Sequence, residues 1–200
     1  MIEVKVADGV TVLTLARPEK ANALTEDMLR DLRDAVRATQ TPVLVLTGQG
    51  SVFSAGADLD AARAGLAVSP LWEELSGAIA DHGGLTIAAL NGSAAGGAMG
   101  MVLACDLRVA VRAAKFFYPV MELGFLPQPS DPKRMTALTG SAKAKRLFMA
   151  GEKITAQTAL AWGLVDEVVE AGEVMDHAMA WAAKATRAHQ GHAAAIKALF

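Results

Sequence analysis

The chain has 200 residues, of which 52% are hydrophobic, and 19 Lys and Arg stand against 21 Asp and Glu for a net charge of −2. This composition disfavours a disordered chain and offers no basic footprint for nucleic acid or an acidic membrane surface. With one cysteine, no signal-peptide pattern after Met1 and no apolar run long enough to span a bilayer, we expect a cytoplasmic protein without nucleic-acid or membrane partners.

The first half of the chain alternates strand and helix patterns. Asp8-Gly9 between two alternating apolar runs predicts a β-hairpin, and Thr25 is a typical N-cap with acidic residues after it. The continuous apolar run 43–47 is typical of a strand buried on both faces. The strands expected here cover residues 2–6, 10–15, 43–47 and 85–90, and helices are expected from Thr25, Asp58 and about Leu71. The glycine-rich segment 48–56 reads as a loop.

The second half of the chain predicts more helix. A short apolar strand pattern covers residues 107–110, and four prolines make the stretch 119–132 mostly irregular. Helices are expected at 141–150 and 155–162, each closed by a glycine, with a short strand at 165–169 and a largely helical end at 173–200. This alternation predicts one α/β domain over residues 1–200, with a core to about 170 and a short helical region after it.

A glycine-rich stretch, 91–100, follows the strand pattern 85–90 and leads into a helical pattern. Glycines let a ligand approach the main chain, and the first N–H groups of a helix lack partners within the helix. Gly96-Gly97-x-x-Gly100 lacks the opening of a dinucleotide fingerprint, and the chain has no Gly-Lys-Ser/Thr phosphate loop. The stretch therefore predicts an anion-binding turn, with close helix–strand packing as the alternative.

A second turn, at 52–59, also follows a strand pattern and precedes a helix start. Loops at the carboxyl ends of parallel strands can meet at one ligand. One backbone N–H group from each turn would then bind a single carbonyl oxygen and form an oxyanion hole if that oxygen became an enolate.

These segments, in this order and spacing, resemble the enoyl-CoA hydratase/isomerase (crotonase) family over almost the whole chain. The motifs are 17–24, 53–58, 91–97, Cys105-Asp106, Leu123-Gly124 with Pro127, and Ala159-x-x-Trp162-Gly163-Leu164-Val165. The resemblance implies an α/β, crotonase-like (ClpP/crotonase) β-β-α superhelix with a C-terminal helical region. It also implies an acyl-CoA substrate, with CoA as part of that substrate and no separate cofactor, and a homotrimer or hexamer.

The resemblance assigns site residues as well. The oxyanion donors would be the N–H groups of Ala57 and Gly97. Residues along the coenzyme A path would be Lys20, Ala21, Ala23, Ala55, Asp58 and Leu59. The four histidines are scattered without carboxylate or cysteine company, so no metal site is expected.

Three departures from the family concern proton transfer. Hydratases carry one glutamate three residues beyond the oxyanion glycine, where this chain has Gly100, and another after a proline, where it has Val120. A further group places its carboxylate at the position of Gln128. Because none of these side chains titrates usefully, we expect no ordinary hydration.

Other side chains of the chain are candidates for the missing proton transfer. Glu122 would face the same side as Val120 if that segment were extended, and a carboxylate beside an apolar acyl pocket has a raised pKa. Its alternatives are a solvated loop residue or a structural ion pair. Asp131 is interpreted as a helix cap, Asp58 as an N-cap, and Tyr118 as a strand residue that could hydrogen-bond an acyl group.

Two functions remain open from the sequence. The first is an enoyl-CoA hydratase/isomerase family enzyme with Glu122 as its proton shuttle, which favours double-bond isomerisation because one base suffices. The second is a catalytically inactive acyl-CoA-binding or regulatory homologue. Family members usually continue past residue 200 through further helices, so we also expect a more open site or one covered by a partner subunit.

Overall fold

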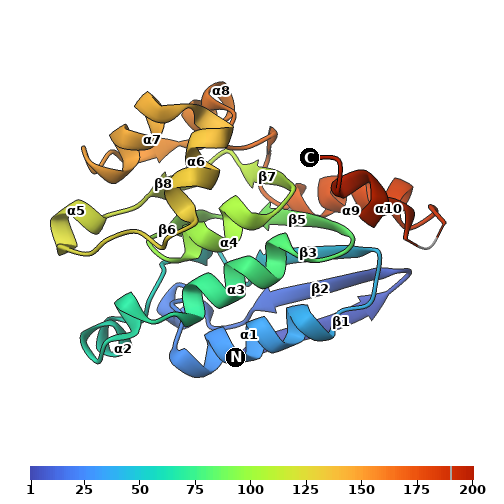
Figure 1. The fold of residues 1–200 in the computed structure, drawn as a ribbon, viewed down its shortest axis with the longest axis horizontal. Helices are drawn as coiled ribbons and strands as arrows, with labels where there is room; N and C mark the ends of the chain where they lie inside the picture. The colour runs from blue at the N-terminus through green and yellow to red at the C-terminus, as the bar shows by residue number, and fades with distance from the viewer. Residues whose placement is uncertain (190) are drawn as a thin grey trace.

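The computed structural model describes residues 1–189 and 191–200 and contains two β-sheets (Figure 1). The larger has the strand order β1-β2-β3-β5-β7-β10, and the smaller has the order β4-β6-β8-β9. The strands are β1 Ile2–Ala7, β2 Val10–Leu15, β3 Val43–Gly48, β4 Val52–Ser54, β5 Leu85–Leu90, β6 Ser93–Ala95, β7 Leu107–Val111, β8 Lys115–Phe117, β9 Ile154–Thr155 and β10 Glu167–Val169.

The larger sheet confirms the predicted hairpin and crossovers. β1 and β2 pair antiparallel across Asp8-Gly9, while β2, β3, β5, β7 and β10 pair parallel to their neighbours. β3 is the strand expected to be buried on both faces, and its residues from Val43 to Leu46 are at most 3% exposed. The carboxyl ends of β3 and β5 lead directly into β4 and β6 of the smaller sheet.

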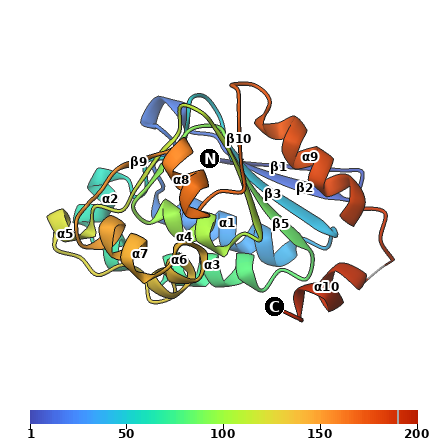
Figure 2. The same cartoon turned by 90° about the horizontal axis from the view of Figure 1, so that it is seen from above.

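Helices cover both faces of the larger sheet. α1, α3 and α4 pack against one another on one side, and α9 contacts β5 and β7 on the other (Figure 2). The helices are α1 Glu26–Ala38, α2 Leu59–Arg63, α3 Leu71–Ala80, α4 Ala98–Ala104, α5 Val120–Leu123, α6 Asp131–Thr139, α7 Ser141–Phe148, α8 Ala156–Trp162, α9 Val174–Ala185 and α10 His192–Lys197. In the described part of the chain, no helix is both long and apolar enough to cross a bilayer.

Several predicted helix ends are confirmed. The Thr25 side chain accepts the Met28 N–H at the start of α1, the Asp58 carboxylate accepts the Asp60 and Ala61 N–H groups at the start of α2, and Gly163 closes α8 in the left-handed region. Cys105 is a buried core residue, and burial raises the pKa of its thiol to about 12.

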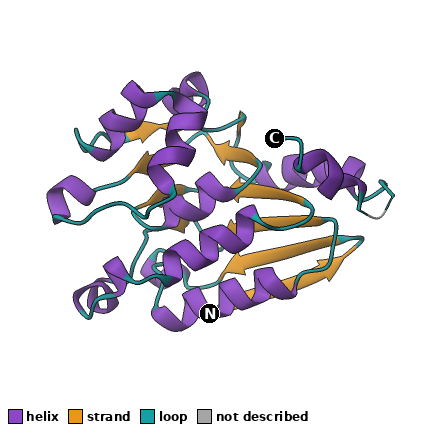
Figure 3. Ribbon diagram, in the orientation of Figure 1, coloured by secondary structure: helices purple, strands orange, loops and turns teal. Residues whose placement is uncertain are grey.

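The structure adds elements that the sequence patterns missed. β4 lies inside the predicted loop 48–56, and β6 lies inside the glycine-rich stretch; each has three residues, too few to show an alternating pattern. The proline-rich stretch is also more regular than expected, since it contains α5 and leads into α6 (Figure 3). Pro132 occupies the first turn of α6, where its missing N–H costs no helix hydrogen bond.

Candidate active site

Two turns of the chain meet where the smaller sheet joins the larger one. β4 and β6 pair in parallel, which brings the turn after Ser54 beside the turn after Ala95. A Cβ atom placed on Gly56 would lie 2.7 Å from the Ala95 carbonyl oxygen and 3.5 Å from the Gly97 nitrogen. Gly56 also has a φ of +90°, so only glycine fits this close approach of two backbones.

Each turn presents a backbone N–H group. Within the described residues, the Ala57 and Gly97 N–H groups have no hydrogen-bond acceptor, although other backbone groups of both turns are paired. The Leu24 N–H donates to the Gly56 carbonyl at 2.7 Å, and the Gly96 N–H donates to the Phe117 carbonyl at 3.1 Å. Gly97 also stands at the N-terminal end of α4. Two neighbouring N–H groups without acceptors can donate to one oxygen atom.

Two asparagines hold the turn between β3 and β4, and β4 leads into the turn that presents the Ala57 N–H. The Asn22 side chain donates to the carbonyls of Gln49 and Val52 at 2.9 and 2.8 Å and accepts the Arg17 N–H at 2.9 Å. The Asn91 side chain accepts the Gly48 N–H at 3.0 Å. These bonds satisfy backbone groups that no sheet partner reaches, so the turn is held by side chains that themselves stay outside the site.

A cavity of about 230 Å³ opens at the two N–H groups. Most of its wall is apolar, which suits an acyl chain better than a sugar or a phosphate. Its lining residues are Ala55, Ala57, Leu59, Ala62, Ala67, Trp72, Gly96, Gly97, Tyr118, Pro119, Val120, Leu123, Phe125, Leu126 and Gln128. No lining residue in the described part of the chain is an aspartate, a glutamate or a histidine.

The residues expected along the coenzyme A path lie on the loops beside this cavity. Ala55 and Leu59 line it, and the Ala21 carbonyl accepts the Ala55 N–H at 3.0 Å, which joins the two loops. Lys20 is exposed at the end of the short 3₁₀ helix Pro18–Lys20, which precedes Ala21. Ala23 is buried, and its carbonyl accepts an N–H of the Arg17 side chain at 3.0 Å.

Asp58 is a structural residue in this neighbourhood. The Arg17 guanidinium donates to its carboxylate at 2.8 Å and, with the N–H groups at the start of α2, lowers the pKa of that carboxyl. The N-cap interpretation of Asp58 is therefore confirmed, and the ion pair ties the loop before α1 to the turn that presents Ala57.

Two of the three positions at which the resemblance would place an acid line the cavity. Val120 and Gln128 line it, and Gly100 lies one helical turn below Gly97 in α4. A Cβ atom on Gly100 would lie 3.1 Å from Oδ1 of Asp131 and 3.2 Å from Oδ2. The space over Gly100 is thus occupied by a carboxylate from another helix.

The premise for Glu122 is wrong. The segment is not extended, because Val120–Leu123 forms the short helix α5, which turns Glu122 away from the side that Val120 shares with the cavity. Glu122 is exposed, and its Oε1 lies 3.6 Å from the position of a Cβ atom on Gly151. It stands outside the cavity wall.

Asp131 and Tyr118 also differ from expectation. Asp131 does not cap α6; its carboxylate is fully buried and accepts the Tyr118 hydroxyl at 2.9 Å. Burial raises the pKa of Asp131 to about 6, an effect that the Tyr118 hydrogen bond and the charge of Arg134 reduce. Tyr118 follows β8 and lines the cavity beside Gly97, and burial beside Asp131 raises the pKa of its phenol.

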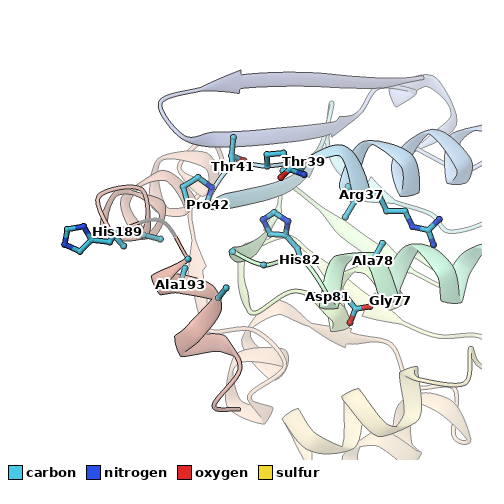
Figure 4. A pocket seen from close by; sticks show the side chains of 18 of the residues that line it. Arg37, Thr39, Thr41, Pro42, Gly77, Ala78, Asp81, His82, His189 and Ala193 are labelled. Atoms are coloured by element: carbon cyan, nitrogen blue, oxygen red, sulfur yellow. The ribbon is translucent and has the colours of Figure 1, made fainter.

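A larger groove, of about 1020 Å³, lies elsewhere in the molecule (Figure 4). It is bordered by the ends of α1 and α3 and by the segment that leads into α10, with His82, Asp81 and His189 around it. Burial lowers the pKa of His82, and its Nε2 has no partner among the described residues. The turns at Ala57 and Gly97 do not border this groove, so its size does not make it the active site.

Comparison of this chain with protein families, curated proteins and solved structures identifies one family. The family described as "Enoyl-CoA hydratase/isomerase" matches residues 5–200. The Mycobacterium leprae protein named "Probable enoyl-CoA hydratase echA6" is 35% identical over 193 residues, covering 93% of this chain and 76% of that protein. "Mevalonyl-coenzyme A hydratase SIDH" of Beauveria bassiana is 36% identical over 86% of this chain and 68% of its own. The solved structure of Pseudomonas aeruginosa DspI matches with a TM-score of 0.90 and 35% identity, over 99% of this chain and 79% of that one.

Proposed function

The chain belongs to the enoyl-CoA hydratase/isomerase (crotonase) family, and from this premise we propose that it binds an acyl-CoA thioester and shifts the double bond of an enoyl chain through an enolate. Family membership confirms the resemblance and the crotonase-like fold expected from the motifs. The proposal places the thioester carbonyl oxygen between the N–H groups of Ala57 and Gly97.

One observation carries the proposal: two N–H groups without acceptors among the described residues stand side by side at the mouth of an apolar cavity. A carbonyl oxygen that gains negative charge is stabilised most by donors already in place, because no reorganisation is needed. The apolar wall suits the acyl chain, and the exposed loop at Lys20 suits the polar coenzyme.

Isomerisation fits this site better than hydration does. Two of the relatives named above are called hydratases, and the resemblance would place the hydratase glutamates at the positions that Gly100 and Val120 occupy in this chain. Moving a double bond needs one group that takes a proton from one carbon and returns it to another, without a positioned water. The proposal includes a homotrimer or hexamer in the cytoplasm, on the strength of the resemblance alone.

A second function is favoured by the composition of the cavity wall. Because no described residue lining the cavity carries a carboxylate or an imidazole, the chain could bind acyl-CoA without turnover, as a carrier or regulatory subunit. Binding is common to both functions, and turnover separates them.

The experiment measures binding and turnover side by side. Calorimetry compares hexanoyl-CoA with S-hexyl-CoA, a thioether that lacks the carbonyl, and we expect the thioester to bind at least tenfold more tightly. NMR then follows 3-hexenoyl-CoA, for which we expect 2-hexenoyl-CoA and no 3-hydroxy product. Equal affinities would contradict the carbonyl site, binding without conversion would favour the carrier, and a 3-hydroxy product would overturn the preference for isomerisation.

A further inference from the structure

A carboxylate occupies the space over Gly100, and it comes from α6 rather than from α4. The two oxygens of Asp131 lie 3.1 and 3.2 Å from where a Cβ atom on Gly100 would be. Contacts of this length are tighter than most Cβ contacts, so a side chain at position 100 would push the Asp131 carboxylate away by a few tenths of an ångström or more. The chain therefore has a carboxyl group beside the helix turn where its hydratase relatives carry one, supplied from a residue 31 positions later.

The Asp131 carboxylate is buried and only partly satisfied. The residue is 0% exposed, and Oδ1 has no hydrogen-bond partner among the described residues. A buried carboxylate oxygen without a donor costs free energy, and residues that only support a fold rarely keep one. The oxygen without a donor, Oδ1, therefore indicates a functional role for Asp131 in addition to its hydrogen bond with Tyr118.

Tyr118 connects this carboxylate to the cavity. Its hydroxyl donates to Oδ2 of Asp131 at 2.9 Å, while the residue itself lines the cavity. The Phe117 carbonyl accepts the Gly96 N–H at 3.1 Å. This bond brings Tyr118, the residue after Phe117, close to Gly97, the residue after Gly96. Packing of the phenol against the Phe148 ring, with 5.0 Å between ring centroids, fixes its orientation.

We propose that Tyr118 is the catalytic residue that exchanges protons with the acyl chain, and that Asp131 acts through it as the proton reservoir. This inference rests on the proposed function, because it supplies the proton transfer that an enolate at Ala57 and Gly97 requires. The side chains of Glu122, Val120 and Gln128 have no part in it, although the Gln128 backbone N–H donates to the Tyr118 hydroxyl at 3.5 Å.

The step balances without any further reactant. The Tyr118 oxygen takes a proton from the α-carbon as its own hydroxyl proton passes to Oδ2 of Asp131, and the C–H electron pair moves onto the thioester oxygen. On return, the phenol delivers its proton to the γ-carbon and recovers one from Asp131. One C–H bond breaks, another forms, the double bond moves, and nothing is oxidised or reduced. Because a free phenol is a weak base, the coupled transfer to Asp131 is what makes the first half possible.

The surroundings of Asp131 set how the relay depends on pH. The charged groups that act on it are Arg134, on its own helix, and Glu73, on α3, with the Tyr118 phenol between Asp131 and the cavity. Glu73 is itself engaged by the N–H and hydroxyl of Ser130. Since Asp131 must be ionised to accept a proton and its pKa is raised to about 6, turnover should rise with pH through about 6.

The test uses the full chain, with 3-hexenoyl-CoA as substrate and hexanoyl-CoA as binding probe. We expect Tyr118→Phe and Asp131→Asn to lower kcat by ~10²–10⁴-fold while the Kd for hexanoyl-CoA changes less than threefold. Asp131→Asn should also abolish the rise with pH. The matched control is Asp106→Asn, which removes a carboxylate that accepts from Thr86 and Lys197. Asp106 precedes β7 and does not line the cavity, so this variant should keep both kcat and pH profile.

A further pair of variants moves the carboxylate from position 131 to position 100. Asp131→Gly should be as slow as Asp131→Asn, and Gly100→Glu combined with Asp131→Gly should recover at least tenfold, since the acid then comes from α4. Unchanged kcat in Tyr118→Phe, or an unchanged pH profile in Asp131→Asn, would overturn the relay while leaving the proposed function standing. If the unaltered protein binds hexanoyl-CoA and converts nothing, the enzymatic function fails, and the relay fails with it.

Discussion

Two regions border the same cavity and are built in different ways. The turns that present Ala57 and Gly97 consist of backbone, with no charge and with small residues that let the chains touch. The other region consists of side chains, where Tyr118 and the buried carboxylate of Asp131 from α6 share a hydrogen bond. The first region depends on how the backbones of two turns pack together, and the second depends on which side chains two distant segments supply.

This difference indicates which of the two regions tolerates substitution and which can be rebuilt from other residues. A backbone N–H group survives most substitutions as long as the turn survives, so oxyanion-type turns persist wherever the fold does. A side-chain acid can be lost from one helix and supplied from another if a glycine makes room for it. Gly100 and Asp131 are such a pair in this chain.

Among the further variants that compare the two regions, the largest effect is expected where the backbone region alone is disturbed. Gly56→Ala would place a methyl group 2.7 Å from the Ala95 carbonyl and push the two turns apart. We expect kcat for 3-hexenoyl-CoA to fall by ~10²–10³-fold, the loss typical of a displaced oxyanion donor. Gly65→Ala is the matched control, because Gly65 has a φ of +105° but nothing within 4 Å, and it should keep its activity. Equal losses in both variants would mean that backbone strain, not the contact between the turns, is responsible.

The second prediction concerns Asp131 and the pH dependence of the free energy of unfolding. The pKa of Asp131 is raised from its ordinary 3.8 to about 6, so between these values the folded chain holds a proton that the unfolded chain has released. The free energy of unfolding must therefore fall as the pH rises through this window, by about 3 kcal/mol from this group. Asp131→Asn should lack the fall, and urea unfolding of both proteins from pH 4 to 7 measures the difference. Parallel curves would show that Asp131 is not a buried acid of this kind.

A third, smaller effect is expected from Asn22, whose side chain holds the turn between β3 and β4. Asn22→Ala removes two donors to the carbonyls of Gln49 and Val52, and the free energy of unfolding should drop by about 2 kcal/mol. Gln49→Ala removes only an exposed hydrogen bond to Glu3 and should change stability by less than about 0.5 kcal/mol. If the two variants were equally stable, the asparagine would not be what holds the turn.

The smallest effect is expected at Glu122. Because this side chain is exposed on α5 and outside the cavity wall, Glu122→Gln should leave kcat and its pH dependence within twofold of the unaltered protein. A large loss of kcat in this variant would move the proton-transferring group away from Tyr118 and Asp131.

The sequence was informative where the chain acts locally. The hairpin at Asp8-Gly9, the caps at Thr25 and Asp58, and the buried strand β3 follow from neighbours in sequence, and all were predicted. The ordered motifs also predicted the family and its fold, which the comparisons confirm. The roles of Ala57 and Gly97 remain a prediction.

The missed features depend on long-range contacts. Nothing near Asp131 in sequence shows that its carboxylate lies over Gly100 or reaches Tyr118. The one available signal was Gly100 itself, a glycine at a position where the resemblance would place an acid. The error at Glu122 came from assuming an extended backbone after Pro119, where four residues form a helix instead.

The central claim, that backbone and side-chain halves act together on one α-carbon, is tested most directly by hydrogen exchange. Hexanoyl-CoA is incubated in D₂O with saturating protein, and NMR follows the loss of its α-proton signal. The account predicts exchange well above the rate without protein, slowed by ~10²-fold or more in Tyr118→Phe at unchanged binding. Saturated binding with exchange at the background rate would contradict it.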